Sequence, residues 1–178
     1  MEPDLISLHD RPFDLLVAIA ERAEATLRRR GESVREAGAR VGLAFRSREE
    51  WYITPREEVR EILFPLPLTR LPRAQPWLLG LANVRGFLVA VTDFGHFLGR
   101  GPTEPSDRTR LLWLSHARLP AALLVDEVAG FRLFEATEME TSDGPSFLGG
   151  IEVIGGQSYR HLDIPHLAED PSFLEAAL

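Results

Sequence analysis

The apolar positions before residue 40 follow a helical period. Five of them recur at spacings of three and four, which places them on one face of a helix over residues 10–30: Phe13, Leu16, Ala20, Ala23 and Leu27. Asp10 suits the N-cap, and the arginines at 28–30 suit the negative end of the helix dipole before Gly31. We therefore predict an amphipathic helix within an N-terminal extension of residues 1–38. Isolated helices of this length are marginally stable in water, so we expect its apolar face to dock.

Beyond residue 40 the pattern changes to short apolar runs of four to seven residues, each bounded by Gly, Pro, Asp or Ser. Such runs are typical of strands in small antiparallel barrels. The predicted strands are 41–46, 51–54, 59–64, 79–84, 87–92, 110–114, 121–126, 128–134, 150–154 and 158–162. The chain is therefore predicted to be mainly β.

Breaks in this pattern suggest how the β part is organised. Four prolines between residues 65 and 76 predict an extended loop, with at most one helical turn at 77–79. The Gly- and Pro-containing stretch near 99–108 is the best candidate boundary between two β subdomains. We expect one domain over residues 39–168, followed by a C-terminal tail over 169–178.

The amino-acid composition excludes several kinds of active site and binding site. The chain of 178 residues has a net charge of −7 and no Cys, and all 20 of its basic residues are Arg. The missing Cys excludes disulfides, thiolate nucleophiles and Cys-ligated zinc. The missing Lys excludes Schiff-base chemistry and the phosphate-binding Lys of a P-loop. An acidic chain with an isoelectric point near 5.3 also lacks the basic stripe that nucleic acid requires.

Nothing in the sequence predicts a membrane or secreted location. No apolar run approaches the ~18 residues of a membrane-spanning helix. The first residues, Met1 to Asp4, lack the basic and then apolar pattern of a signal peptide. We therefore expect a cytoplasmic protein.

Several motifs in register resemble the CheW family of chemotaxis coupling proteins. The motifs span roughly residues 40–168 and are Val59-Arg60-Glu61-Ile62, Thr69-Arg70-Leu71-Pro72, Gly80-Leu81-Ala82-Asn83-Val84-Arg85-Gly86, Asp93-Phe94, Leu123-Leu124-Val125-Asp126 and Phe147-Leu148-Gly149-Gly150. The N-terminal helix and the segment 172–177 resemble the branch of CheW-like adaptors found in type IV pilus (twitching-motility) chemosensory systems.

The resemblance implies a fold and a function. The expected fold is a pair of small five-stranded SH3-like β-barrels that share a hydrophobic seam. The expected function is a noncatalytic adaptor, without a cofactor, between a chemoreceptor tip and the regulatory domain of a CheA-like histidine kinase. Carried over from the family, the receptor-facing residues are Val59, Glu61, Gly80, Arg85 and Leu111. The kinase-binding face is expected on the first barrel, without assigned residues.

Other interpretations stay open at this point. A flagellar chemotaxis coupler is the alternative within the family, and a small β-barrel enzyme or ligand-binding protein is a remote one. His161 and Asp163 have metal-ligating side chains on one face of a predicted strand. The turn at Pro165 opposes the convergence of His166 with them, and no third strong ligand group is evident elsewhere in the sequence, so we expect no metal site. Arg85 lies at a predicted turn, where it either pairs internally, for example with Glu61, or contacts a partner.

Overall fold

The computed structural model describes residues 39–135 and 144–176. The predicted helix over 10–30, with the rest of the extension 1–38, lies outside these residues and stays a prediction. The described residues from Val41 onward form one compact unit.

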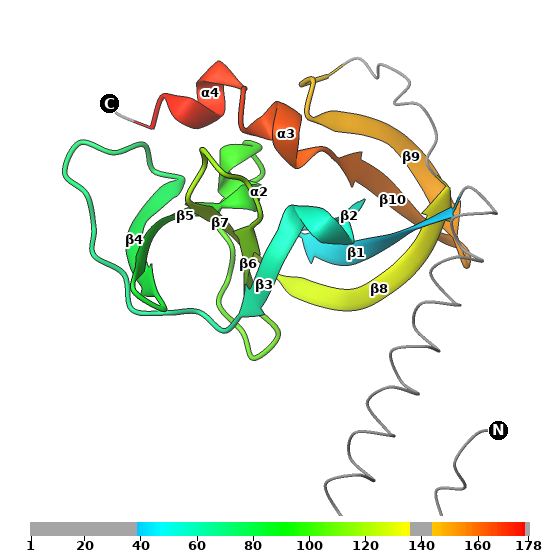
Figure 1. Cartoon of the computed structure of the whole chain (residues 1–178), viewed down its shortest axis with the longest axis horizontal. Coiled ribbons are helices and arrows are strands. Elements are labelled where there is room, and N and C mark those ends of the chain that lie inside the picture. Colours follow the sequence, from blue (N-terminus) through cyan, green and yellow to red (C-terminus); the bar gives the residue numbers. More distant parts are fainter. Residues whose placement is uncertain (1–38, 136–143, 177–178) are drawn as a thin grey trace, which may run out of the picture. The chain divides into compact units, whose positions relative to one another are not determined.

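Ten strands form two five-stranded sheets (Figure 1). In the first sheet the order is β8-β1-β2-β10-β9, and in the second it is β3-β6-β7-β5-β4. The strands are β1 Ala39–Ser47, β2 Glu50–Pro55, β3 Val59–Leu63, β4 Leu78–Val84, β5 Phe87–Asp93, β6 Arg110–Leu114, β7 Ala121–Val125, β8 Glu127–Glu135, β9 Leu148–Ile154 and β10 Gln157–Leu162. This confirms the mainly β class and two five-stranded units, and every predicted strand overlaps an observed one.

The predicted subdomain boundary near 99–108 needs correction. The strands on either side of that stretch, β5 and β6, belong to the same sheet. The chain instead leaves the first sheet after β2, through a single 3-10 turn at Arg56–Glu58, and returns to it at β8. Strand β10, near the C-terminal end of the domain, pairs in parallel with β2, near its N-terminal end, and His161 lies opposite Ile53. This pairing completes the first sheet.

Strands β6 and β7 carry the core on both of their faces. Leu112, Leu114 and Leu123 point into a large apolar cluster that also contains Phe45 and Tyr52 of the first sheet. The alternate residues of these two strands pack into a second cluster inside the second sheet: Leu111, Trp113, Ala122 and Leu124. A strand covered on both faces needs a continuous apolar run, as the sequences of β6 and β7 provide. The large cluster is the shared hydrophobic seam.

Three short helices close the seam: α2 Phe94–Phe97, α3 Ile164–Leu167 and α4 Pro171–Leu174. Each begins with an aspartate whose carboxylate accepts backbone N–H groups of the first turn, as N-caps do. Phe173 of α4 is buried in the seam cluster, where its ring stacks on that of Trp77 with centroids 6.0 Å apart. The expected tail from residue 169 is therefore part of the packed domain as far as it is described.

The proline-rich segment between β3 and β4 is extended, as predicted, and no helical turn forms at 77–79 because β4 begins at Leu78. Its side chains Leu66 and Leu68 pack on the core of the second sheet. Thr69 exchanges two backbone hydrogen bonds with Leu81, at 2.8 and 2.9 Å, so the segment crosses close over β4. In the described part of the chain, no helix has the length and apolar character needed to cross a membrane.

Candidate partner-binding surface

The five residues carried over as receptor-facing divide into an exposed pair and a buried set. Glu61 and Arg85 reach the surface, with 29% and 72% of their side chains exposed. Val59 and Leu111 are 9% and 1% exposed and belong to the two core clusters. Gly80 is buried as well. In this conformation, Glu61 and Arg85 offer a partner more accessible surface than the other three residues do.

Arg85 forms the ion pair that its position allowed. Its Nη2 lies 2.7 Å from Oε1 of Glu61, and this hydrogen bond raises the pKa of Arg85. Arg85 occupies the two-residue turn between β4 and β5 with a positive φ of 50°, and Gly86 follows with a φ of 87°. The side chain of Asn83 accepts the Gly86 N–H at 2.8 Å and fixes the turn. Glu61 is on β3 and Arg85 next to β4, so the pair joins the two strands at opposite ends of the sheet order.

The buried members also have structural roles, and their assignment as receptor contacts stays a prediction. Gly80 has a φ of 141°, and a Cβ there would lie 2.4 Å from the carbonyl oxygen of Thr69. Val59 packs in the seam cluster from β3, the strand that also carries Glu61, and Leu111 packs in the second cluster from the neighbouring strand β6.

A groove of about 560 Å³ is lined in part by Arg60 and Phe87, which are close in sequence to Glu61 and Arg85. Its lining also includes Trp113 and residues of the 115–120 connection between β6 and β7. The guanidinium carbon of Arg60 lies 4.2 Å from the centroid of the Trp113 ring and 5.3 Å from that of Phe87. Sequence reasoning missed this arrangement because three strands must meet to create it, and no local pattern records their meeting.

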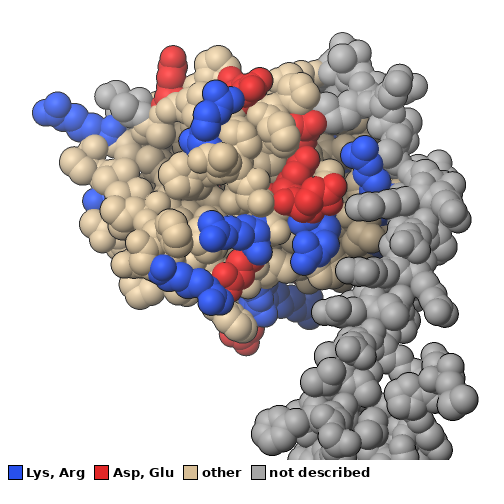
Figure 2. Space-filling model, viewed as in Figure 1, with Lys and Arg blue, Asp and Glu red and all other residues tan. Residues whose placement is uncertain are grey.

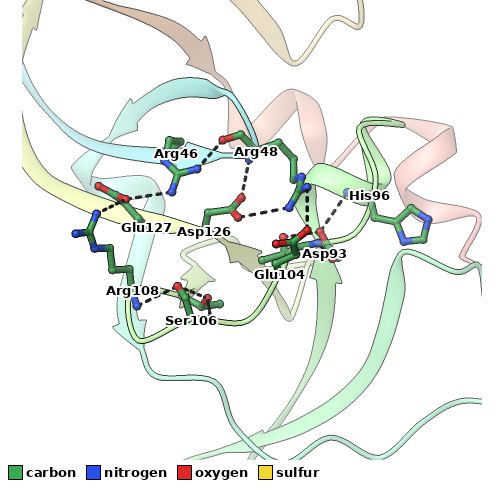
Figure 3. Close-up of polar contacts among 11 residues, drawn as sticks. Arg46, Arg48, Asp93, His96, Glu104, Ser106, Arg108, Asp126 and Glu127 are labelled. Atoms are coloured by element: carbon green, nitrogen blue, oxygen red, sulfur yellow. Dashed lines mark hydrogen bonds and ion pairs between the residues drawn. The ribbon is translucent and has the colours of Figure 1, made fainter.

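A second polar group lies at the junction of the two sheets (Figure 3). The backbone N–H of Arg48, in the β1–β2 turn, donates to Asp126 Oδ2 at 2.6 Å. Arg46 and Arg108 lie 3.1 and 3.4 Å from Oε2 of Glu127, and the hydrogen bond from Arg46 lowers the pKa of Glu127. These acidic and basic groups pair with one another, so they hold the crossover from β7 to β8 against the β1–β2 turn.

Asp93 anchors the loop near residues 99–108, the stretch predicted as the boundary between subdomains. It is 2% exposed, and its carboxylate accepts the backbone N–H of His96 and both the N–H and the hydroxyl of Thr103, at 2.7 to 3.1 Å. The loop after α2 is thereby tied to the end of β5 (Figure 3).

In residues 39–135 and 144–176, no group of three or more potential metal ligands converges. His161 lies 3.0 Å from Glu152, whereas His166 pairs with Asp163 at 2.9 Å. Acidic and basic side chains alternate over the face shown in Figure 2, which presents no broad basic area.

With two five-stranded sheets, a shared seam and an exposed ion pair at one hairpin, the molecule is of the double β-barrel class. Residues 41–172 match the family model of the CheW-like domain. The chain belongs to this CheW-like family.

Individual relatives and a solved structure also resemble this chain. Protein PilI of Pseudomonas aeruginosa is 32% identical over 175 residues, which cover 94% of this chain and 97% of PilI. A probable chemotaxis protein CheW of Rhizobium etli is 32% identical over 92 residues, which cover 52% of this chain and 59% of that protein. The crystal structure of the scaffolding protein TtCheW from Thermoanaerobacter tengcongensis shares the fold, with a TM-score of 0.66 at 21% identity, and covers 75% of this chain and 94% of that one.

Proposed function

We propose that this chain is a noncatalytic adaptor that couples a chemoreceptor of the methyl-accepting type to a CheA-like histidine kinase, in the system that controls type IV pilus twitching motility. The observation that carries the proposal is the match to PilI. It covers 94% of the chain, so it extends into the residues before Ala39, whereas the Rhizobium etli CheW match covers about half of the chain. A cytoplasmic location at membrane-associated chemosensory arrays follows from this role.

The receptor is proposed to bind across the β4–β5 turn, where Arg85 and Glu61 are exposed. An arginine at a hairpin tip, followed two residues later by Phe87 in the lining of an apolar groove, suits a helical partner that carries carboxylates. Val59, Gly80 and Leu111 then act from below, by holding β3, β4 and β6 in place.

The kinase regulatory domain is proposed to bind the first sheet. Its edge strands carry apolar side chains that are more than half exposed: Phe131 and Leu133 on β8, and Ile151 and Val153 on β9. Two separate surfaces allow one adaptor to hold receptor and kinase together.

Arg85→Glu tests the receptor surface. Surface ion pairs contribute only ~0–1 kcal/mol to folding, so the variant should keep a near-native melting midpoint. Loss of an interfacial charge contact should weaken binding to the receptor's cytoplasmic fragment more than tenfold, as measured by calorimetry, while kinase binding is retained. Arg108→Glu is the matched control, because Arg108 is also exposed and also paired, with Glu127 at the sheet junction.

The double variant Glu61→Arg/Arg85→Glu separates the two roles of Arg85. It restores an internal ion pair with the charges exchanged, and it reverses the charges that a partner meets. Receptor binding should stay weak. Recovery of wild-type affinity would mean that Arg85 acts only through its pairing with Glu61, and the contact assignment would then be wrong.

A gene deletion separates the pilus and flagellar alternatives. Loss of twitching with normal swimming supports the pilus assignment, and the reverse phenotype supports a flagellar coupler.

The noncatalytic role predicts that the purified chain neither hydrolyses ATP nor accepts phosphate from the phosphorylated kinase. Stable phosphorylation of the chain would contradict it.

A further inference from the structure

Arg60 is placed by an irregularity of β3. The register of β3 on β6 shifts between Val59, which lies opposite Leu114, and Glu61, which lies opposite Trp113. Arg60 is the additional residue, and bulges of this kind redirect a side chain. The redirected guanidinium lies over the ring of Trp113, which is buried, and near that of Phe87, which is half exposed.

Arg60 differs from its neighbours in having no acidic partner. Arg85 pairs with Glu61, and Arg118 with Glu169. Among the residues that the structure describes, no carboxylate lies within ion-pair distance of Arg60. A guanidinium stacked on an aromatic face keeps the N–H groups along its edge available for a carboxylate, which can accept two of them in parallel.

The groove beside Arg60 matches this chemistry. Its polar side chains are those of Arg60, Ser115 and His116, its remaining lining is apolar or aromatic, and it contains no Asp or Glu. His116 also has a buried Nδ1 without a hydrogen-bond partner in the described chain. The mouths of β-barrels are common binding sites, and an apolar wall with few polar groups orients what enters.

We propose that this groove binds a carboxylate-bearing side chain of the chemoreceptor tip, with Arg60 as the cation that holds it and Trp113 and Phe87 as the platform that holds Arg60. The inference rests on the proposed receptor-coupling function. The receptor is the chosen occupant because two residues that line the groove are close in sequence to the Arg85–Glu61 pair: Arg60 directly precedes Glu61, and Phe87 is the second residue after Arg85. An acidic segment with apolar flanks complements both the charge and the walls.

The test measures binding of the receptor's cytoplasmic fragment to Arg60→Gln and Arg60→Glu by calorimetry at two salt concentrations. Arg60→Glu should weaken binding more than tenfold, Arg60→Gln less, and both should reduce the salt dependence of the affinity. Arg56→Gln is the matched control, because Arg56 is exposed and also lies over an aromatic ring, that of Phe131, but does not line the groove. Its affinity should equal that of the wild type.

Charge reversal on the receptor completes the test. Single Asp→Arg and Glu→Arg changes across the receptor tip should include one that binds Arg60→Glu more tightly than it binds the wild type. If Arg60→Glu folds and binds the receptor normally while Arg85→Glu does not, the groove assignment is wrong and the proposed function stands. If Arg60→Glu loses the kinase and keeps the receptor, the occupant is wrong. If the wild type does not bind the receptor at all, both proposals fail. Arg60→Lys, which keeps the charge and loses the planar stack, provides the comparison should Arg60→Glu unfold.

Discussion

Gly80 shows how a single residue without a side chain positions the candidate surface. Its φ of 141° disfavours any L side chain, and a Cβ would clash with the backbone of Thr69. Gly80→Ala should therefore lower the free energy of unfolding by about 1–3 kcal/mol, measured by urea denaturation. Gly150→Ala in β9 is the control, because a Cβ at Gly150 meets no atom within 4 Å. Equal stability of the two variants would contradict the close approach of the 65–77 segment to β4.

The sequence left two interpretations of Arg85 open, an internal ion pair with Glu61 and a contact with a partner. The structure contains the internal ion pair. The burial of Leu111 was not predictable in the same way. Every residue of β6 from Leu111 to Leu114 is buried, so neither the alternation of strand faces nor a motif distinguishes a core position from a surface one. A family motif identifies such a residue as important without saying whether it touches the partner.

At the scale of elements, the sequence located the strands because Gly, Pro and Asp interrupt the apolar runs close to their ends. It did not reveal which strands pair across the chain. The parallel contact between Tyr52 in β2 and Arg160 in β10 joins positions more than a hundred residues apart, and local patterns carry no register for such a pair. The boundary near 99–108 was misplaced for this reason, since turn signals mark ends of strands and not ends of sheets.

Glu58 ties two of these elements together. Its carboxylate accepts the hydroxyl of Thr54 at 2.8 Å and the backbone N–H of Ile164, at the start of α3, at 3.0 Å. Burial raises the pKa of Glu58, so the folded protein holds this proton to a higher pH than the unfolded chain does. The contribution of Glu58 to stability should therefore fall as the pH rises past the ordinary glutamate pKa, and level off above the raised one.

Glu58→Gln tests this pH dependence. The amide keeps an acceptor but has no charge to bury, so the variant should gain stability relative to the wild type as the pH rises through that window. Urea denaturation of both proteins at several pH values measures the difference. Glu49→Gln, at an exposed position in the β1–β2 turn, is the control. A pH-independent difference for Glu58→Gln would show that burial does not govern this carboxylate.

At the scale of the whole domain, the first sheet is built from two separate stretches of chain, whereas the second sheet is one continuous stretch from β3 to β7. The second sheet is inserted between β2 and β8 of the first, and the seam cluster takes side chains from both. The charged group around Arg46, Asp126 and Glu127 joins the sheets again at the β7–β8 crossover (Figure 3). One sheet cannot lose its structure without exposing the apolar face of the other, so we expect the two sheets to unfold together.

Leu123→Ala tests this coupling, because Leu123 is fully buried in the seam on the central strand β7. The cavity should cost about 2–5 kcal/mol of unfolding free energy. Single-tryptophan variants that keep Trp51 in the first sheet or Trp113 in the second report the two sheets separately by fluorescence. Both reporters should give one coincident urea transition, and Leu123→Ala should shift both equally. Leu133→Ala, at an exposed position of β8, should shift neither by much. If Leu123→Ala moves the Trp113 transition and leaves the Trp51 transition in place, the sheets are independent units and the seam does not couple them.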